Sequence, residues 1–164
     1  MRKFVISILV TIGVITTIIS SCNNIISQSN QDKNECRDII NRFTQACNSY
    51  NANDAMNCLE LGTVYTLATD VKAKKFSDKK EENVYAFNKI IKNVFDSEFN
   101  MIYEDLPKMK IDIKKLKTTK KGMEAEEKVS YHNLTKKAKI SLVTQNLTMT
   151  NFNYSWQIDK IVLN

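Results

Sequence analysis

Apolar side chains recur at helical spacing in the part of the chain that follows residue 34. Between Glu35 and Tyr50 they fall at i, i+3, i+4 and i+7, at Cys36, Ile39, Ile40, Phe43, Cys47 and Tyr50. This spacing is typical of an amphipathic helix with one buried stripe. The polar residues 51–54 interrupt the stripe, and Asn53 or Asp54 can cap a second, short helix that stops at Gly62.

A third helix is predicted from Val84 onward, with apolar residues on one side and charged residues on the other. Its apolar side holds Val84, Phe87, Ile91, Val94, Phe95 and Ile102. The pattern fades near Glu104, and Pro107, the only proline, marks a stop. Between the second and third helices, residues 63–69 predict either a short strand or more helix. The lysine-rich residues 70–82 predict an exposed connection.

Beyond Pro107 the apolar period changes from about 3.6 to 2, which indicates β-strands. Met109, Ile111 and Ile113 alternate with charged residues, and three more alternating segments cover residues 123–131, 138–149 and 152–163. The apolar parity slips inside the last two segments, which predicts a bulge or a strong bend. Short polar turns join the strands, so we expect an antiparallel meander. The order of elements predicts an α+β fold, with N-terminal helices packed on a curved antiparallel sheet of four or more strands.

The first residues of the chain have the pattern of a bacterial export signal. Arg2 and Lys3 precede an apolar run from Phe4 to about Ile19, which is shorter than the roughly 20 residues of a comfortable membrane span. The sequence Ile19-Ser20-Ser21-Cys22 resembles the lipobox of bacterial lipoproteins. A signal anchor and an ordinary signal peptide with a fortuitous cysteine are the alternatives.

The lipobox resemblance implies that the signal is cut before Cys22 and that this cysteine carries the lipid. We therefore expect a signal peptide over residues 1–21, a lipidated cysteine with a flexible tether over 22–34, and a single domain over 35–164. Several acyl chains hold a protein firmly to a bilayer, whereas one chain holds it only marginally. No acidic residue follows Cys22 directly, which favours an anchor in the outer membrane that faces the periplasm.

The basic balance of the chain does not indicate a nucleic-acid partner. The net charge is +6, and lysines carry most of the positive charge because Arg37 and Arg42 are the only arginines beyond the signal. Nucleic-acid sites favour arginine and exposed aromatic residues. A solvated lysine face, or attraction to anionic lipid headgroups, is the expected role of the lysines.

The cysteines and the single histidine predict neither a metal site nor a cofactor. Cys36, Cys47 and Cys58 are eleven residues apart, and a helix break near Asn51 can bring Cys47 close to Cys58. A Cys47–Cys58 disulfide is one interpretation for an oxidising envelope, and reduced, buried thiols are the other. There is no Cys-x-x-Cys pair, and His132 is remote from the cysteines and expected in an exposed turn.

The order of elements and two short motifs resemble a known superfamily. The motifs are the Asn-Asp turn within FTQACNSYNANDAMNCL and the ending Trp156-Gln157-Ile158-Asp159-Lys160-Ile161. The chain resembles small bacterial lipoproteins with the cystatin-like cone fold of nuclear transport factor 2 and ketosteroid isomerase. This resemblance implies a sheet curved around a cone whose mouth holds a small molecule or a partner.

Three functions are compatible with these patterns. The first is a non-catalytic binding or protein-interaction module, with Phe43, Phe87, Tyr131, Tyr154 and Trp156 as candidates to line an apolar pocket or simply to fill the core. The second, implied by the resemblance, is an isomerase- or cyclase-type enzyme that uses a strand carboxylate as its base. Glu127 is the candidate because it lies on the apolar parity of its strand, although a bulge that turns it to water is the more common arrangement. The third is an inhibitor or immunity-type protein that binds a protein partner.

Overall fold

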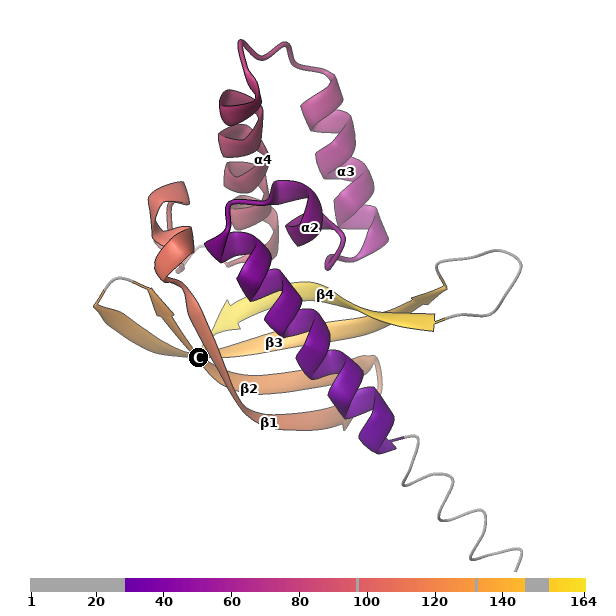
Figure 1. Cartoon of the computed structure of the whole chain (residues 1–164). Helices are drawn as coiled ribbons and strands as arrows, with labels where there is room; N and C mark the ends of the chain where they lie inside the picture. The colour runs from indigo at the N-terminus through magenta and orange to yellow at the C-terminus, as the bar shows by residue number, and fades with distance from the viewer. Residues whose placement is uncertain (1–28, 97, 132, 147–153) are drawn as a thin grey trace, which may run out of the picture. The chain divides into compact units, whose positions relative to one another are not determined.

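The computed structural model describes residues 29–96, 98–131, 133–146 and 154–164 (Figure 1). The chain divides into two compact units, residues 1–34 and residues 35–164. In the first unit, residues 29–34 are helical. Our prediction of a flexible tether up to residue 34 is therefore wrong for these six residues, among which only the glutamine and the lysine are good helix formers. The signal, Cys22 and the rest of the tether lie outside the described residues.

The second unit begins with helices, as the spacing predicted. The helix that starts in the first unit continues to residue 48. It is followed by α2 (Ala52–Met56), α3 (Leu61–Lys72), α4 (Lys79–Val94) and the 3-10 helix η1 (Tyr103–Lys108). The predicted stripe of the first helix is buried, with Cys36, Ile40, Phe43 and Cys47 at 0% exposure.

The segment that the sequence left ambiguous is helical. α3 covers residues 63–69 and has Gly62 in its first turn, so Gly62 does not stop the preceding helix. The exposed connection predicted over residues 70–82 is only six residues long, from 73 to 78. The signal that we missed is a capping arrangement at the start of α4, where the Asp78 carboxylate accepts from the backbone N–H of Glu81 at 2.8 Å.

α4 also ends earlier than its apolar pattern predicted. Val94 is the last helical residue, and Phe95 is extended, with φ −87° and ψ 148°. The N–H of Asp96 then donates to Ile161 at 3.0 Å, and the Asp96 carboxylate accepts from the N–H of Leu163 at 2.9 Å. Bonding to the last strand therefore replaces further helical bonding after Val94, although the apolar pattern continues to Ile102.

The strands form one antiparallel sheet in the order of the sequence, which confirms the predicted meander. They are β1 (Lys110–Thr119), β2 (Gly122–Tyr131), β3 (Leu134–Asn146) and β4 (Tyr154–Leu163). The register between β3 and β4 shifts after Ser141, where Asp159 is the extra residue on β4, and this confirms the predicted slip in the last strand. A second shift near Lys114 in β1 was not predicted. Residues 147–149, on which the other predicted slip depended, lie outside the described part of the chain.

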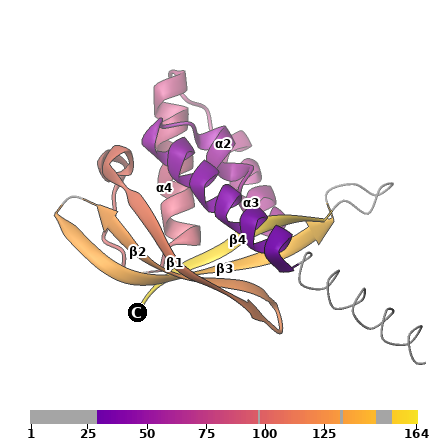
Figure 2. The same ribbon diagram turned by 60° about the horizontal axis from the view of Figure 1, so that its bottom comes forward.

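The helices of the second unit lie on one face of the curved sheet, so the predicted α+β architecture is confirmed (Figure 2). The outer edge of β4 is covered by the chain that follows α2 and α4. Leu59 pairs with Ile158, and Phe95 pairs with Ile161, both in parallel. The side chain of Gln157 reinforces this contact when its amide nitrogen faces the loop after α2, where it donates to Asn57, Cys58 and Leu59 at 3.1–3.2 Å.

Candidate functional site

The aromatic residues considered as pocket lining lie in the core of the unit. The four whose side chains are described are Phe43 and Phe87 (0% exposed), Tyr131 (2%) and Trp156 (9%). Phe43 packs against Phe95 with ring centroids 6.2 Å apart, and Tyr131 packs against Phe99 at 6.1 Å. The side chain of Tyr154 lies outside the described part of the structure. The rings of Phe43, Phe87 and Tyr131 therefore pack against other core rings, at Phe95, Tyr103 and Phe99 respectively, and help to fill the core.

Trp156 is the one of these four that also borders a surface hollow. The hollow has a volume of about 300 Å³ and is lined by Glu35, Asp38, Ile39, Arg42, Ser155 and Trp156. Three of its six lining residues are charged, and Trp156 is the one aromatic residue among them. It resembles a polar surface depression more than the apolar mouth of a cone.

Glu127 lies on the buried face of β2, and this arrangement is the less common of the two that we considered. Its side chain is 3% exposed, and its neighbours across the sheet are Ile113 and Ala138. Neither carboxylate oxygen has a hydrogen-bond partner in the described structure. Burial raises the pKa of Glu127 to about 8, and the nearby backbone of Ile140 offsets only part of that rise. Burial therefore favours the neutral, protonated form of this side chain at pH 7.

Two further ionisable groups, Tyr131 and Asp105, lie near the C-terminal end of β2. Tyr131 is four residues from Glu127 on the same face of the strand, and burial raises the pKa of its phenol, with the charges of Asp105 and Asp96 as smaller causes. Asp105 is 1% exposed, and its carboxylate accepts from the N–H of Ile102 at 3.0 Å. These groups are of the types that proton-transfer enzymes use. Four hollows among the described residues are lined by other side chains, and Glu127, Tyr131 and Asp105 line none of these four.

The three described cysteines are free thiols in the core. Burial raises the pKa of Cys47, and the neighbouring Cys58 raises it further, so the two thiols lie near each other. Burial also raises the pKa of Cys58 to about 11, and its Sγ donates to the carbonyl of Asp54 at 3.3 Å. Thiols with raised pKa values are poor nucleophiles and poor metal ligands.

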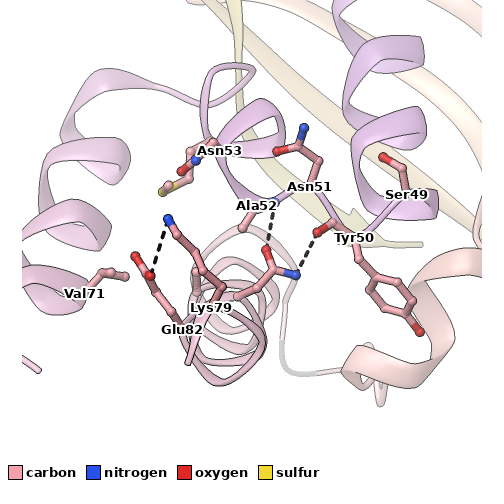
Figure 3. A pocket seen from close by; sticks show the side chains of 11 residues that line it. Ser49, Tyr50, Asn51, Ala52, Asn53, Val71, Lys79 and Glu82 are labelled. Atoms are coloured by element: carbon pink, nitrogen blue, oxygen red, sulfur yellow. Dashed lines mark hydrogen bonds and ion pairs between the residues drawn. The ribbon is translucent and has the colours of Figure 1, made fainter. Parts of the chain in front are cut away.

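A second hollow lies where the end of the first helix meets α2, α3 and α4 (Figure 3). Its volume is about 350 Å³, and most of its lining is polar. Its charged residues are Lys79 and Glu82, whose side chains are 3.9 Å apart and of which Lys79 is almost fully exposed. Such a solvated pair contributes little binding energy by itself.

Asn83 organises the floor of this hollow. Its Nδ2 donates to the carbonyl of Tyr50 at 2.7 Å, and its Oδ1 accepts from the N–H of Ala52 at 3.2 Å. The same nitrogen lies 3.3 Å from the hydroxyl of Tyr103. Figure 3 shows both bonds to the turn as dashed lines, with the ring of Tyr50 directed away from Lys79 and Glu82. The polar groups of the Asn83 side chain at the floor are therefore already hydrogen-bonded within the protein.

Sequence reasoning did not identify Asn83, because an asparagine within a charged helix carries no local signal of a long-range contact. The end of the first helix is a second feature that the sequence did not reveal. The N–H of Tyr50 donates to Cys47 at 3.1 Å and that of Asn51 to Ala46 at 2.9 Å, which is the bonding of a Schellman motif. That motif usually has glycine where this chain has Tyr50, so composition alone did not predict it.

The proposed lipid anchor falls outside the described residues, as does His132. Within the described part, no helix combines the length and the apolar character that a bilayer span requires. The described residues also contain no group of three acidic, histidine or cysteine side chains that could hold a metal ion.

Comparison with known proteins gave no relative for this chain: no family model, curated protein or solved structure matches it significantly.

Proposed function

We propose that this chain is a lipid-anchored protein-interaction module of the bacterial cell envelope, bound to the membrane through Cys22. One observation carries the interaction part of the proposal. Phe43, Phe87 and Tyr131, which would have to line a ligand cone, are packed into the core instead. A cone that is filled by its own side chains leaves the outer surface as the part of the molecule that can bind. Binding of a protein partner, including an inhibitor or immunity-type role, needs only such a surface.

The anchor part of the proposal rests on the sequence. The apolar run ends in Ile19-Ser20-Ser21-Cys22, and the polar residues that follow separate this cysteine from the folded unit. An outer-membrane position facing the periplasm is part of the same proposal, because no acidic residue follows Cys22 directly.

Mass spectrometry of the full chain purified from bacterial membranes tests both parts. We expect the N-terminal peptide to begin at Cys22 and to carry acyl chains, and we expect Cys22→Ser to abolish both the cleavage and the acylation. Native mass spectra in the presence of envelope extract should contain a protein-sized addition. A stoichiometric addition of a few hundred daltons would instead support a small-ligand pocket and overturn the interaction part.

The alternative of an isomerase- or cyclase-type enzyme is kept because of Glu127. A neutral, buried acid with unpaired oxygens is an arrangement that enzymes use for proton transfer. Proton transfer also needs a space in which a substrate reaches the carboxyl group, and Glu127 lines none of these four hollows. A ligand addition that Glu127→Gln abolishes and Glu126→Gln leaves intact would favour the enzyme over the interaction module.

A further inference from the structure

The exposed side of α3 and of the loop that follows it has an uneven distribution of charge. Among the exposed positions between Leu61 and Ser77 there are three lysines and no acidic residue. The lysines, Lys72, Lys74 and Lys75, lie together at the C-terminal end of the helix. This surface, called the α3 face below, is therefore apolar or neutral at one end and basic at the other.

The apolar end of the α3 face consists of two large side chains one turn apart. Leu61 is 47% exposed and Tyr65 is 76% exposed, which places both among the most exposed large apolar residues of the described chain. On a helical projection Leu61, Tyr65 and Lys72 fall within an arc of about 40°. One flat surface can therefore contact the apolar and the basic end at the same time.

The acidic residues nearest in sequence are engaged in other contacts. The Asp70 carboxylate holds Lys89 at 2.6 Å, on the side of α3 that faces α4. Asp78 caps α4, and the Glu81 carboxylate accepts from the N–H and the hydroxyl of Ser77 at 2.7 Å. Lys74 is partly engaged, because its ammonium lies 4.3 Å from the centre of the Tyr85 ring. None of the three lysines has a carboxylate partner among the salt bridges of the described residues.

We propose that the α3 face docks onto the anionic headgroups of the bilayer to which Cys22 anchors the chain. The inference rests on the proposed anchor and adds a second, electrostatic contact to it. Tyrosine and leucine side chains enter the interfacial region of a bilayer, while neighbouring lysines meet the lipid phosphates. An anionic bilayer surface matches a face whose exposed charges between Leu61 and Ser77 are all lysines, of which Lys74 also interacts electrostatically with the nearby Glu81. Docking would fix which side of the folded unit faces away from the membrane and meets a partner.

The test uses the full chain, purified from bacterial membranes and placed in nanodiscs that contain spin-labelled lipids. A fluorophore is attached at Thr66→Cys, on the exposed side of α3, or at Lys120→Cys, in the exposed turn between β1 and β2, as a matched control. The native cysteines of the folded unit are buried and do not compete for the label. Co-elution of the chain with the discs measures the anchor, and quenching of the fluorophore by the lipids measures docking.

We expect quenching at position 66 but not at position 120, in discs with anionic lipids and not in discs with neutral lipids. Salt at 0.5 M should abolish the quenching and leave co-elution intact, because the acyl anchor is not electrostatic. Lys72→Gln with Lys75→Gln should lower the docking equilibrium about 30-fold. The matched pair Lys136→Gln with Lys137→Gln removes the same charge from β3 and should leave docking unchanged.

The anchor and the docking contact can fail separately. Co-elution without quenching at position 66 would overturn the docking contact and leave the anchor standing. A fluorescence change at position 66 that needs no lipid and grows with protein concentration would assign the α3 face to a second copy, and would also overturn it. If the chain does not co-elute but is quenched on anionic vesicles, docking is supported and the anchor is lost.

Discussion

The ring of Tyr50 stacks on the ring of Tyr103, with centroids 4.4 Å apart and planes inclined by 25°. Tyr50 ends the first helix in a left-handed conformation with φ 54°, the only positive φ among the described residues other than glycine. A side chain in this region costs about 1 kcal/mol, which glycine avoids. The stack connects the turn after the first helix to η1, and this contact compensates for the backbone strain.

This balance predicts an unusual order of stability for substitutions at position 50. Tyr50→Ala loses the stack and keeps the strain, so we expect it to lower the free energy of unfolding by about 1–2 kcal/mol. Tyr50→Gly loses the stack and relieves the strain, so it should be about 1 kcal/mol more stable than Tyr50→Ala. Urea denaturation measures both values. An alanine variant that is more stable than the glycine variant would contradict the left-handed conformation of Tyr50.

Asn83 should be sensitive to a change of one atom. Asn83→Asp replaces the amide nitrogen that donates to the carbonyl of Tyr50 by a second acceptor, so two acceptors would face each other. We expect a loss of about 2 kcal/mol in the free energy of unfolding. Asn93→Asp is the matched control, since Asn93 lies on the same helix and donates to Lys89 at an exposed position. Its effect should stay within about 0.5 kcal/mol. Equal effects at both positions would show that Asn83 does not hold the turn.

The sequence predicted those parts of the fold in which a period is long and uninterrupted. The first helix and β2 are examples, because their buried faces repeat over about ten residues or more. The prediction for the segment from Gly62 to Glu82 was wrong because α3 buries little. Leu67 is its only buried residue, so its apolar pattern is weak. The predicted end of α4 was wrong because hydrogen bonds to β4, which is far away in the sequence, replace helical hydrogen bonds after Val94.

The candidate residues show the same limit. Strand parity placed Glu127 on the apolar side of β2, and the structure buries it there. Parity does not indicate whether a buried ring lines a cavity or fills one, because that depends on the depth of the helix layer above the sheet. Asn83 bonds to a turn more than thirty residues away, and no local spacing encodes such a contact.

The buried thiols should react slowly in the folded chain. Since burial raises the pKa values of Cys47 and Cys58, little thiolate is present at pH 8. We expect iodoacetamide to label neither residue until denaturant is added, whereas Thr118→Cys, at an exposed position of β1, should be labelled at once. The alternative interpretation from the sequence, a Cys47–Cys58 disulfide in place of the free thiols of the structure, is tested on the same sample. A bonded pair would lower the intact mass by about 2 Da and would resist labelling even in denaturant.

Glu127 should make the stability of the protein fall as the pH rises. Its pKa is about 8 in the folded chain, against an ordinary value of 4.5. Between these values the folded state holds a proton that the unfolded state has released, so folding becomes less favourable with increasing pH. The loss should begin near pH 4.5, level off above about pH 8, and reach several kcal/mol, on the order of 1.4 kcal/mol per unit of pKa shift.

Two glutamine variants separate this effect from the general titration of the surface. Glu127→Gln cannot ionise, so we expect it to be more stable than the wild type at pH 9 and similar to it at pH 5. Glu126→Gln is the matched control on the opposite face of β2, where the ion pair with Lys117 lowers the pKa of Glu126. The contribution of Glu126 is therefore present at neutral pH and lost in acid, the reverse of Glu127. Urea denaturation from pH 4 to pH 9 measures both. If Glu127→Gln and the wild type have parallel profiles, Glu127 is ionised in the folded protein, and a space that admits water or a ligand must reach its carboxylate.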